Sequence, residues 1–147
     1  MTAAVVLKHE FVEFIPDDLK DGTIYVSIRF ATASHKCCCG CGNKVVTPIR
    51  PTDWMLIFDG KTISLDPSIG NWGFPCRSHY WIKNNHARWA AQWSEVDVDA
   101  GRAQDQFAKK RYFDTAKADA EKATLPTAAT PKETRGIWQR VKQWWQS

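Results

Sequence analysis

Four of the chain's five cysteines fall within five positions, in the stretch "HKCCCGCGNKVV" that begins at His35. The fifth, Cys76, lies in "FPCRSHYWI", three residues before His79. Zinc takes four thiolate or imidazole ligands in a tetrahedron, commonly as two pairs on tight turns that are far apart in the sequence. The two stretches therefore predict one Zn²⁺ site joining distant parts of the chain, and such a site contributes on the order of 10 kcal/mol to folding.

The first stretch holds more thiols than one zinc ion needs. Strand alternation would place Cys37 and Cys39 on one side of the chain and Cys38 on the other, so we leave Cys38 out. The ligands that we favour are Cys39, Cys41, Cys76 and His79, with Cys37 as a close alternative. Buried free thiols and a redox pair are the competing interpretations, and an iron–sulfur cluster is disfavoured because its cysteines usually have longer, regular spacings.

The composition is that of a soluble globular protein, with 44% apolar and 24% charged residues in a chain of 147. No apolar run approaches the roughly 20 residues that a membrane span needs. The N-terminus lacks the pattern of a signal peptide, so we expect a cytoplasmic protein, in which cysteine clusters favour metal binding over disulfides. The net charge of +4 is spread thinly along the chain, which argues against a nucleic-acid partner.

Short alternating patterns predict a β domain over residues 8–94, with about six or seven strands. "FVEFIP" predicts a first strand ended by Pro16, and "TIYVSIRF" predicts a strand from Thr23 to Phe30 with alternating faces. Asp59-Gly60 and Asn84-Asn85 each stand between apolar runs and predict hairpin turns.

The composition changes near Glu95. Residues 95–123 are rich in Ala, Lys, Gln and Asp and predict a helix with a weak apolar stripe, and residues 124–130 read as a linker. Residues 131–147 follow a capping box at Thr130 and predict an amphipathic helix. The predicted fold is therefore mostly β (α+β overall), a small zinc-stabilised antiparallel β domain with C-terminal helices. The last helix is expected to pack on the chain itself, and contact with a membrane is the less favoured alternative.

The block from about Phe11 to Ala90 resembles a bacterial family found beside ubiquitin-like conjugation genes, called BubE-like. The resemblance is carried by "VEFIPDDLKDGTIYVSI", "HKCCCGCGNKVVTPIRPTDWMLIFDGKTISL" and "PSIGNWGFPCRSHYWI". It implies a metal-binding β domain with peptidase or deconjugase activity, and a protein partner such as a ubiquitin-like protein or its conjugation enzymes. The positions that match the family pattern are His35, Cys37, Cys39, Cys41, Cys76, Ser78 and His79.

Two kinds of catalytic centre are compatible with these residues. A zinc ion with three protein ligands and a water would need a general base, for which Glu13 is the candidate, although Glu13 also fits a solvated strand face. A serine peptidase needs a nucleophile and a base. Ser68 in "PSIGNW" is the candidate nucleophile, His35 or His79 the base, and Asp53 the group that orients the base.

Three functions are considered, the first implied by the resemblance and the other two by the residue patterns. The first is a peptidase or deconjugase that acts on a ubiquitin-like protein. The second is a non-catalytic, zinc-stabilised module that binds a protein partner, and the third is a zinc-ribbon-like nucleic-acid binder. Loss of cleavage on substitution of His35 or Ser68 would separate the first from the second, and steep salt dependence would identify the third.

Overall fold

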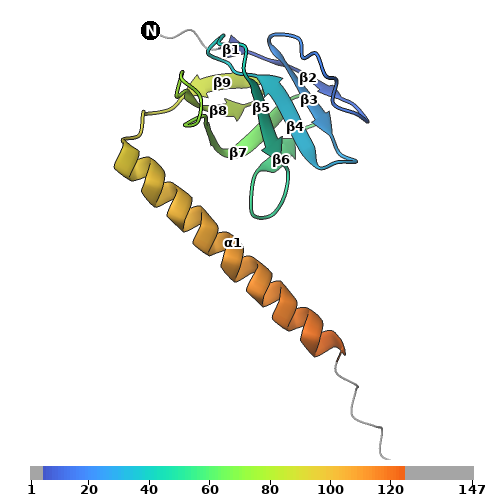
Figure 1. Ribbon diagram of the computed structural model, residues 1–147. Coiled ribbons are helices and arrows are strands. Elements are labelled where there is room, and N and C mark those ends of the chain that lie inside the picture. The colour runs from blue at the N-terminus through green and yellow to red at the C-terminus, as the bar shows by residue number, and fades with distance from the viewer. Residues whose placement is uncertain (1–4, 125–147) are drawn as a thin grey trace, which may run out of the picture. The chain divides into compact units, whose positions relative to one another are not determined.

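The structure is a computed structural model that describes residues 5–124, with nine strands in two sheets followed by one helix (Figure 1). The chain divides into two compact units, one ending at Tyr112 and the other beginning at Phe113. Both sheets belong to the first unit. This arrangement confirms the predicted mostly β architecture. The strands outnumber the six or seven expected, in part because β1 (Val5–Val6) is too short to show an alternating pattern.

The first sheet has five strands in the order β1-β9-β8-β7-β6, and all its pairs are antiparallel. Its other strands are β6 (Met55–Phe58), β7 (Ile63–Gly70), β8 (His79–Lys83) and β9 (His86–Trp89). The second sheet has the order β2-β3-β4-β5, and its β2–β3 pair is parallel. Its strands are β2 (Lys8–Phe11), β3 (Thr23–Ser27), β4 (Thr32–Lys36) and β5 (Lys44–Pro48).

One apolar core joins the two sheets, which lie against each other in Figure 1. Ile24 and Val26 of β3 contribute from one sheet, and Leu65 of β7 and Ile82 of β8 contribute from the other. All four side chains are fully buried. Burial of a large aliphatic side chain stabilises a fold by about 1.5–3 kcal/mol. The shared core therefore holds the two sheets packed against each other.

The two predicted hairpin turns are confirmed. Asn84 and Asn85 join β8 to β9 with φ angles of 47° and 61°, as a two-residue turn between twisted strands requires. Asp59 shapes the turn between β6 and β7, because its carboxylate accepts hydrogen bonds from the backbone amides of Lys61 and Thr62. These bonds hold the pKa of Asp59 down at about 2.

Two strand predictions are wrong in extent or position. β3 ends at Ser27, and the chain then turns through Ala31, whose φ is 47°, so Ile28 and Phe30 are exposed instead of lying on a strand face. The strand predicted over "FVEFIP" is misplaced: β2 lies before it and shares only Phe11 with it, and residues 12–16 are not in a strand. Ile28, Phe30 and Phe14, which suggested these strands, are exposed, whereas Val12 and Ile15 are half-buried.

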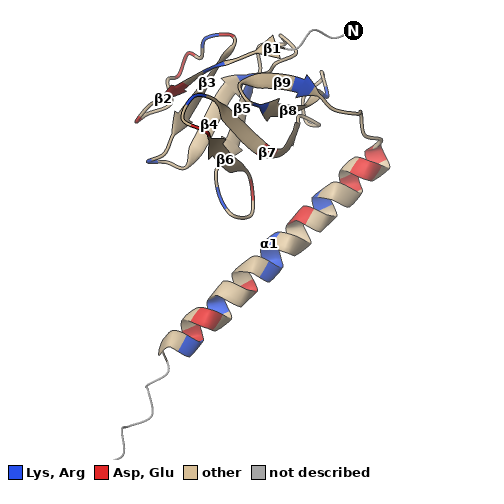
Figure 2. Ribbon diagram, turned by 180° about the vertical axis from the view of Figure 1, so that it is seen from behind, with Lys and Arg blue, Asp and Glu red and all other residues tan. Residues whose placement is uncertain are grey.

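The helix α1 (Glu95–Thr124) begins with a capping box. The hydroxyl of Ser94 accepts a hydrogen bond from the amide of Asp97, and the carboxylate of Asp97 accepts one from the amide of Ser94. The helix begins with acidic residues and carries a mixture of acidic and basic residues along the rest of its length (Figure 2), and Val98 is its buried residue. Within residues 5–124, no helix has the length and apolar character that a bilayer crossing requires. The helix predicted over residues 131–147 lies outside the described residues.

Candidate active site and metal centre

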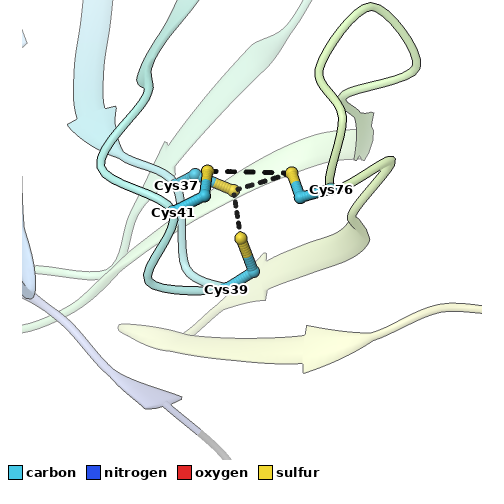
Figure 3. A group of neighbouring side chains, drawn as sticks. All are labelled: Cys37, Cys39, Cys41 and Cys76. Carbon is cyan, nitrogen blue, oxygen red and sulfur yellow. Dashed lines mark hydrogen bonds between the residues drawn. The ribbon is translucent and has the colours of Figure 1, made fainter.

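Four thiols from two distant loops meet at one point (Figure 3). Cys37 directly follows β4, Cys39 and Cys41 lie in the next turn, and Cys76 lies in the connection between β7 and β8. The turn is formed by Gly40 and Gly42, whose φ angles of 87° and 81° are favourable for glycine. The sequence therefore brings the thiols together by placing two flexible glycines between and after the cysteines.

The spacing of the sulfurs fits a tetrahedral metal site. The Sγ atom of Cys37 lies 3.4 Å from that of Cys39 and 3.9 Å from that of Cys76, and the Sγ atoms of Cys41 and Cys76 are 3.7 Å apart. All four lie within 4.8 Å of one another. Zinc–sulfur bonds of about 2.3 Å in a tetrahedron separate the sulfurs by about 3.8 Å. The cluster could thus hold one metal ion with four thiolates and no further protein ligand.

The clustered thiols differ in how readily they ionise: desolvation raises the pKa of Cys39 to about 12, whereas that of Cys41 is lowered. The backbone and side-chain amides of Asn43 donate hydrogen bonds to the sulfur of Cys41 and lower the pKa of that thiol to about 6. The hydroxyl of Ser78 lies 3.0 Å from the sulfur of Cys37 and accepts a hydrogen bond from the Nδ2 of Asn71 at 2.9 Å. Hydrogen bonds from such groups typically orient metal ligands. Cys38 is outside the group, and burial raises the pKa of its thiol to about 12.

His79 is placed with Ser68 and not with the thiols. Its Nε2 lies 2.9 Å from the hydroxyl oxygen of Ser68, and its Nδ1 lies 2.6 Å from the carbonyl oxygen of Ala91. A carbonyl can only accept, so Nδ1 carries the proton and Nε2 is the acceptor for the Ser68 hydroxyl. A serine next to a histidine oriented in this way has the geometry of an activated nucleophile.

An irregularity in β7 accounts for the position of Ser68. Leu65 pairs with Ile82 and Ile69 pairs with Tyr80, so four steps along β7 correspond to two along β8. The extra residues form a bulge that includes Ser68, and bulges commonly redirect a side chain next to an active site. Gly70 pairs with His79 at the far side of the bulge, which brings the histidine beside the displaced serine.

Alternation along β8 separates the two candidate sites. Ser78 precedes the strand and faces the thiols, whereas the adjacent His79 faces Ser68. Neighbouring residues in an extended chain point to opposite sides, which is why Ser78 and His79 cannot act as a pair. The cysteine cluster and the serine–histidine pair are therefore separate, but only two residues lie between Cys76 of the first and His79 of the second.

His35, the other candidate base, is fully buried. Its Nε2 lies 2.9 Å from the hydroxyl of Tyr80, and its Nδ1 has no hydrogen-bond partner within the described part of the chain. Burial lowers the pKa of His35 to about 4, so its ring is neutral at pH 7. The structure thus gives His35 a place in the core beside Tyr80, while the partner of Ser68 is His79.

The two candidate carboxylates pair with cations. Asp53 lies 2.8 Å from the ammonium of Lys109, which holds the pKa of this carboxyl below its usual value. Glu13 forms an exposed ion pair with Arg29. The group that contacts Nδ1 of His79 is instead the carbonyl of Ala91. The role of Ala91 could not be predicted from the sequence, because every residue has a backbone carbonyl.

Comparison with known proteins adds a family match. A family model described as "Bacterial ubiquitination-like system serine protease (BubE)" matches residues 11–90, which is more than half of the 147 residues. No curated protein and no solved structure matches the chain. The matched region contains the four clustered cysteines, Ser68 and His79, and it ends one residue before Ala91.

Proposed function

The chain belongs to the family of bacterial ubiquitination-like system serine proteases (BubE), and we propose that it is a peptidase that cleaves a ubiquitin-like protein. Ser68 is the proposed nucleophile and His79 the proposed general base. The observation that carries this proposal is the 2.9 Å contact between Nε2 of His79 and the hydroxyl of Ser68, with Nδ1 held by a carbonyl. This combination supports acyl transfer more directly than a binding role, in which no activated hydroxyl is needed.

The reaction follows from the direction of these hydrogen bonds. The Ser68 oxygen attacks the carbonyl carbon of the scissile bond while its proton passes to Nε2 of His79. The same proton is then given to the leaving amine, and the acyl group stays on Ser68 as an ester. A water molecule then attacks the ester carbon while its proton passes to Nε2. The bond between the acyl group and Ser68 breaks, Nε2 returns the proton to the Ser68 oxygen, and the acid product leaves as a carboxylate. Throughout, the Ala91 carbonyl accepts a hydrogen bond from Nδ1–H of His79 and stabilises the imidazolium that forms.

The four-cysteine cluster has a structural role in this proposal. Cys37, Cys39, Cys41 and Cys76 would hold one zinc ion. When bound, the ion would supply a covalent cross-link between the turn after β4 and the connection before β8. Four thiolates fill a tetrahedral site, so a metal-bound water with Glu13 as base is not supported. Cys76 lies three residues before His79, and the cluster would therefore fix the start of β8 that presents the base.

Cleavage by purified, metal-loaded variants tests the proposal. The substrate is the ubiquitin-like protein of the same pathway carrying a short C-terminal extension, or joined to a target. We expect Ser68→Ala and His79→Ala to abolish cleavage while keeping metal content and the circular dichroism spectrum of the wild type.

Ser64→Ala is the matched control, because Ser64 lies on the same strand and its hydroxyl accepts a hydrogen bond from the amide of Asn84. It should retain cleavage. If Ser68→Ala cleaves at the wild-type rate, the serine mechanism is wrong. If the wild type binds the ubiquitin-like protein but never cleaves it, the chain is the non-catalytic binding module instead.

A further inference from the structure

The segment that runs from the last matched residue, Ala90, to Trp93 makes further contacts with the proposed base. The segment between β9 and α1 runs along His79: the amide of Ala90 donates to the carbonyl of His79 at 2.9 Å, and the carbonyl of Ala91 accepts from its ring. Two residues later, the indole of Trp93 meets the His79 ring edge-to-face, with the ring centroids 5.3 Å apart. The imidazole is thus held by one hydrogen bond and by an aromatic contact from the same short segment.

A second indole, that of Trp72, contacts both the His79 ring and Trp93. Trp72 lies 5.0 Å from the His79 ring and stacks on Trp93, with centroids 5.7 Å apart and an angle of 18° between the planes. Aromatic pairs at such distances contribute about 0.5–1.5 kcal/mol beyond the area that they bury. Two indoles therefore restrict rotation of the imidazole about its side-chain bonds, because either ring would have to move first.

The first turns of α1 support Trp93 from the other side. A Cβ atom placed on Gly101 would lie 2.8 Å from the Trp93 ring, closer than carbon atoms approach. Glycine inside a helix costs about 1 kcal/mol relative to alanine. The close approach of the indole gives this glycine a structural role, since a side chain at position 101 would displace the Trp93 ring from its present place.

The placement of Trp93 is not explained by burial in the core. Its side chain is 41% exposed, and its ring helps to line a cavity of about 320 Å³ together with Trp72 and Gly70. Gly70 pairs with His79 and lies two residues after Ser68. Neither Ser68 nor His79 lines the cavity, but Trp93 both lines it and contacts His79, so its indole lies between the proposed base and a space that is open to solvent.

We propose that Trp93, which lies outside the region matched by the family model, is a positioning residue for His79. The inference rests on the proposed peptidase function. Trp93 keeps the imidazole in the orientation in which Nε2 faces Ser68 and Nδ1 faces Ala91. Loss of the ring lets the imidazole rotate away from the hydroxyl, which lowers the rate of acyl transfer without removing any group that reacts.

Steady-state kinetics on the full chain tests this inference. We expect Trp93→Ala to lower kcat about 10- to 100-fold, in the range that small misplacements of reacting groups cause, with KM changed less than twofold. Trp93→Phe keeps an aromatic edge against His79 and should recover most of the rate. Trp81→Ala is the matched control, because it removes another half-buried indole of the same domain, whose ring pairs with Lys83, and it should keep the wild-type kcat.

Gly101→Ala provides a test that does not depend on removing an indole. Alanine favours the helix, so the variant should fold, but its methyl group should displace Trp93 and lower kcat as Trp93→Ala does. The inference is overturned if Trp93→Ala and Gly101→Ala both keep the wild-type kcat, or if they raise KM alone, while Ser68→Ala is inactive. Retained activity of Ser68→Ala would instead overturn the proposed function.

Discussion

A backbone carbonyl stands where many serine peptidases have a carboxylate. The carbonyl of Ala91 lies 2.6 Å from Nδ1 of His79, and this single hydrogen bond fixes which ring nitrogen carries the proton. A carbonyl stabilises the imidazolium less than an ionised carboxylate does, but its position is set by the backbone and does not depend on a flexible side chain. We therefore infer that orientation, rather than added negative charge, is the contribution of this third group.

Asp53 provides a test of that inference at a single residue. Asp53 pairs with Lys109, so Asp53→Asn should keep kcat/KM within about threefold of the wild type. Removal of a carboxylate that orients a catalytic histidine lowers kcat about 10⁴-fold in a well-studied serine protease. A loss of that size in Asp53→Asn, with the fold intact, would show that Asp53 reaches His79 during catalysis.

The sequence alone identified the types of residue in the site better than their pairing. The cysteines could be recognised because few other roles require so many thiols so close together. His79 could not be assigned, because its spacing from Cys76 suits a metal ligand equally well and only the bulge in β7 places it beside Ser68. Nothing in the local sequence reveals that register shift.

At the scale of the elements, turns were predicted better than strand ends. Asn84-Asn85 specifies a tight turn through its backbone preferences, which are local and therefore visible in the sequence. The end of β3 at Ser27 is decided by where the chain must turn to pair with β4, which is a tertiary constraint. The alternation of Ile28 and Phe30 continues past that point although both side chains are exposed.

The contribution of the β8–β9 turn to the stability of the domain can be tested by substitution of Asn85. Asn85 has a φ of 61°, and its side-chain oxygen accepts a hydrogen bond from the amide of Ile63 at 2.8 Å. Asn85→Ala should lower the free energy of unfolding by about 2–3 kcal/mol, from the lost hydrogen bond and the strained backbone. Chemical denaturation of the metal-loaded protein measures this.

Asn84→Gly is the control for this turn, because glycine accepts the φ of 47° at that position. It should change the stability by less than about 1 kcal/mol. Equal stability of Asn85→Ala and the wild type would mean that the turn does not hold β7 and β8–β9 together.

For the molecule as a whole, we expect metal binding by the four-cysteine cluster to decide whether the domain folds. The cluster joins the turn after β4, in one sheet, to the connection before β8, in the other. A zinc ion bound by these thiols would cross-link the two sheets, and structural zinc contributes on the order of 10 kcal/mol to folding. The same cross-link lies close in sequence to His79, so folding and activity should depend on the metal together.

Metal removal tests this dependence. Protein purified without chelators should contain one zinc ion per chain by native mass spectrometry. Prolonged treatment with a strong chelator under reducing conditions should unfold the domain and abolish cleavage, and returning zinc should restore both. A metal-free protein that keeps its circular dichroism spectrum and its thermal unfolding temperature would refute the structural role of the four thiols.

The central claim is that His79 makes Ser68 nucleophilic, and a fluorophosphonate reagent tests it without knowledge of the substrate. We predict that the folded, metal-loaded chain gains one label, which peptide mass spectrometry locates on Ser68, and that His79→Ala gains none. The account is contradicted if the folded wild type remains unlabelled under conditions that label a known serine peptidase, or if the label lies on a residue other than Ser68.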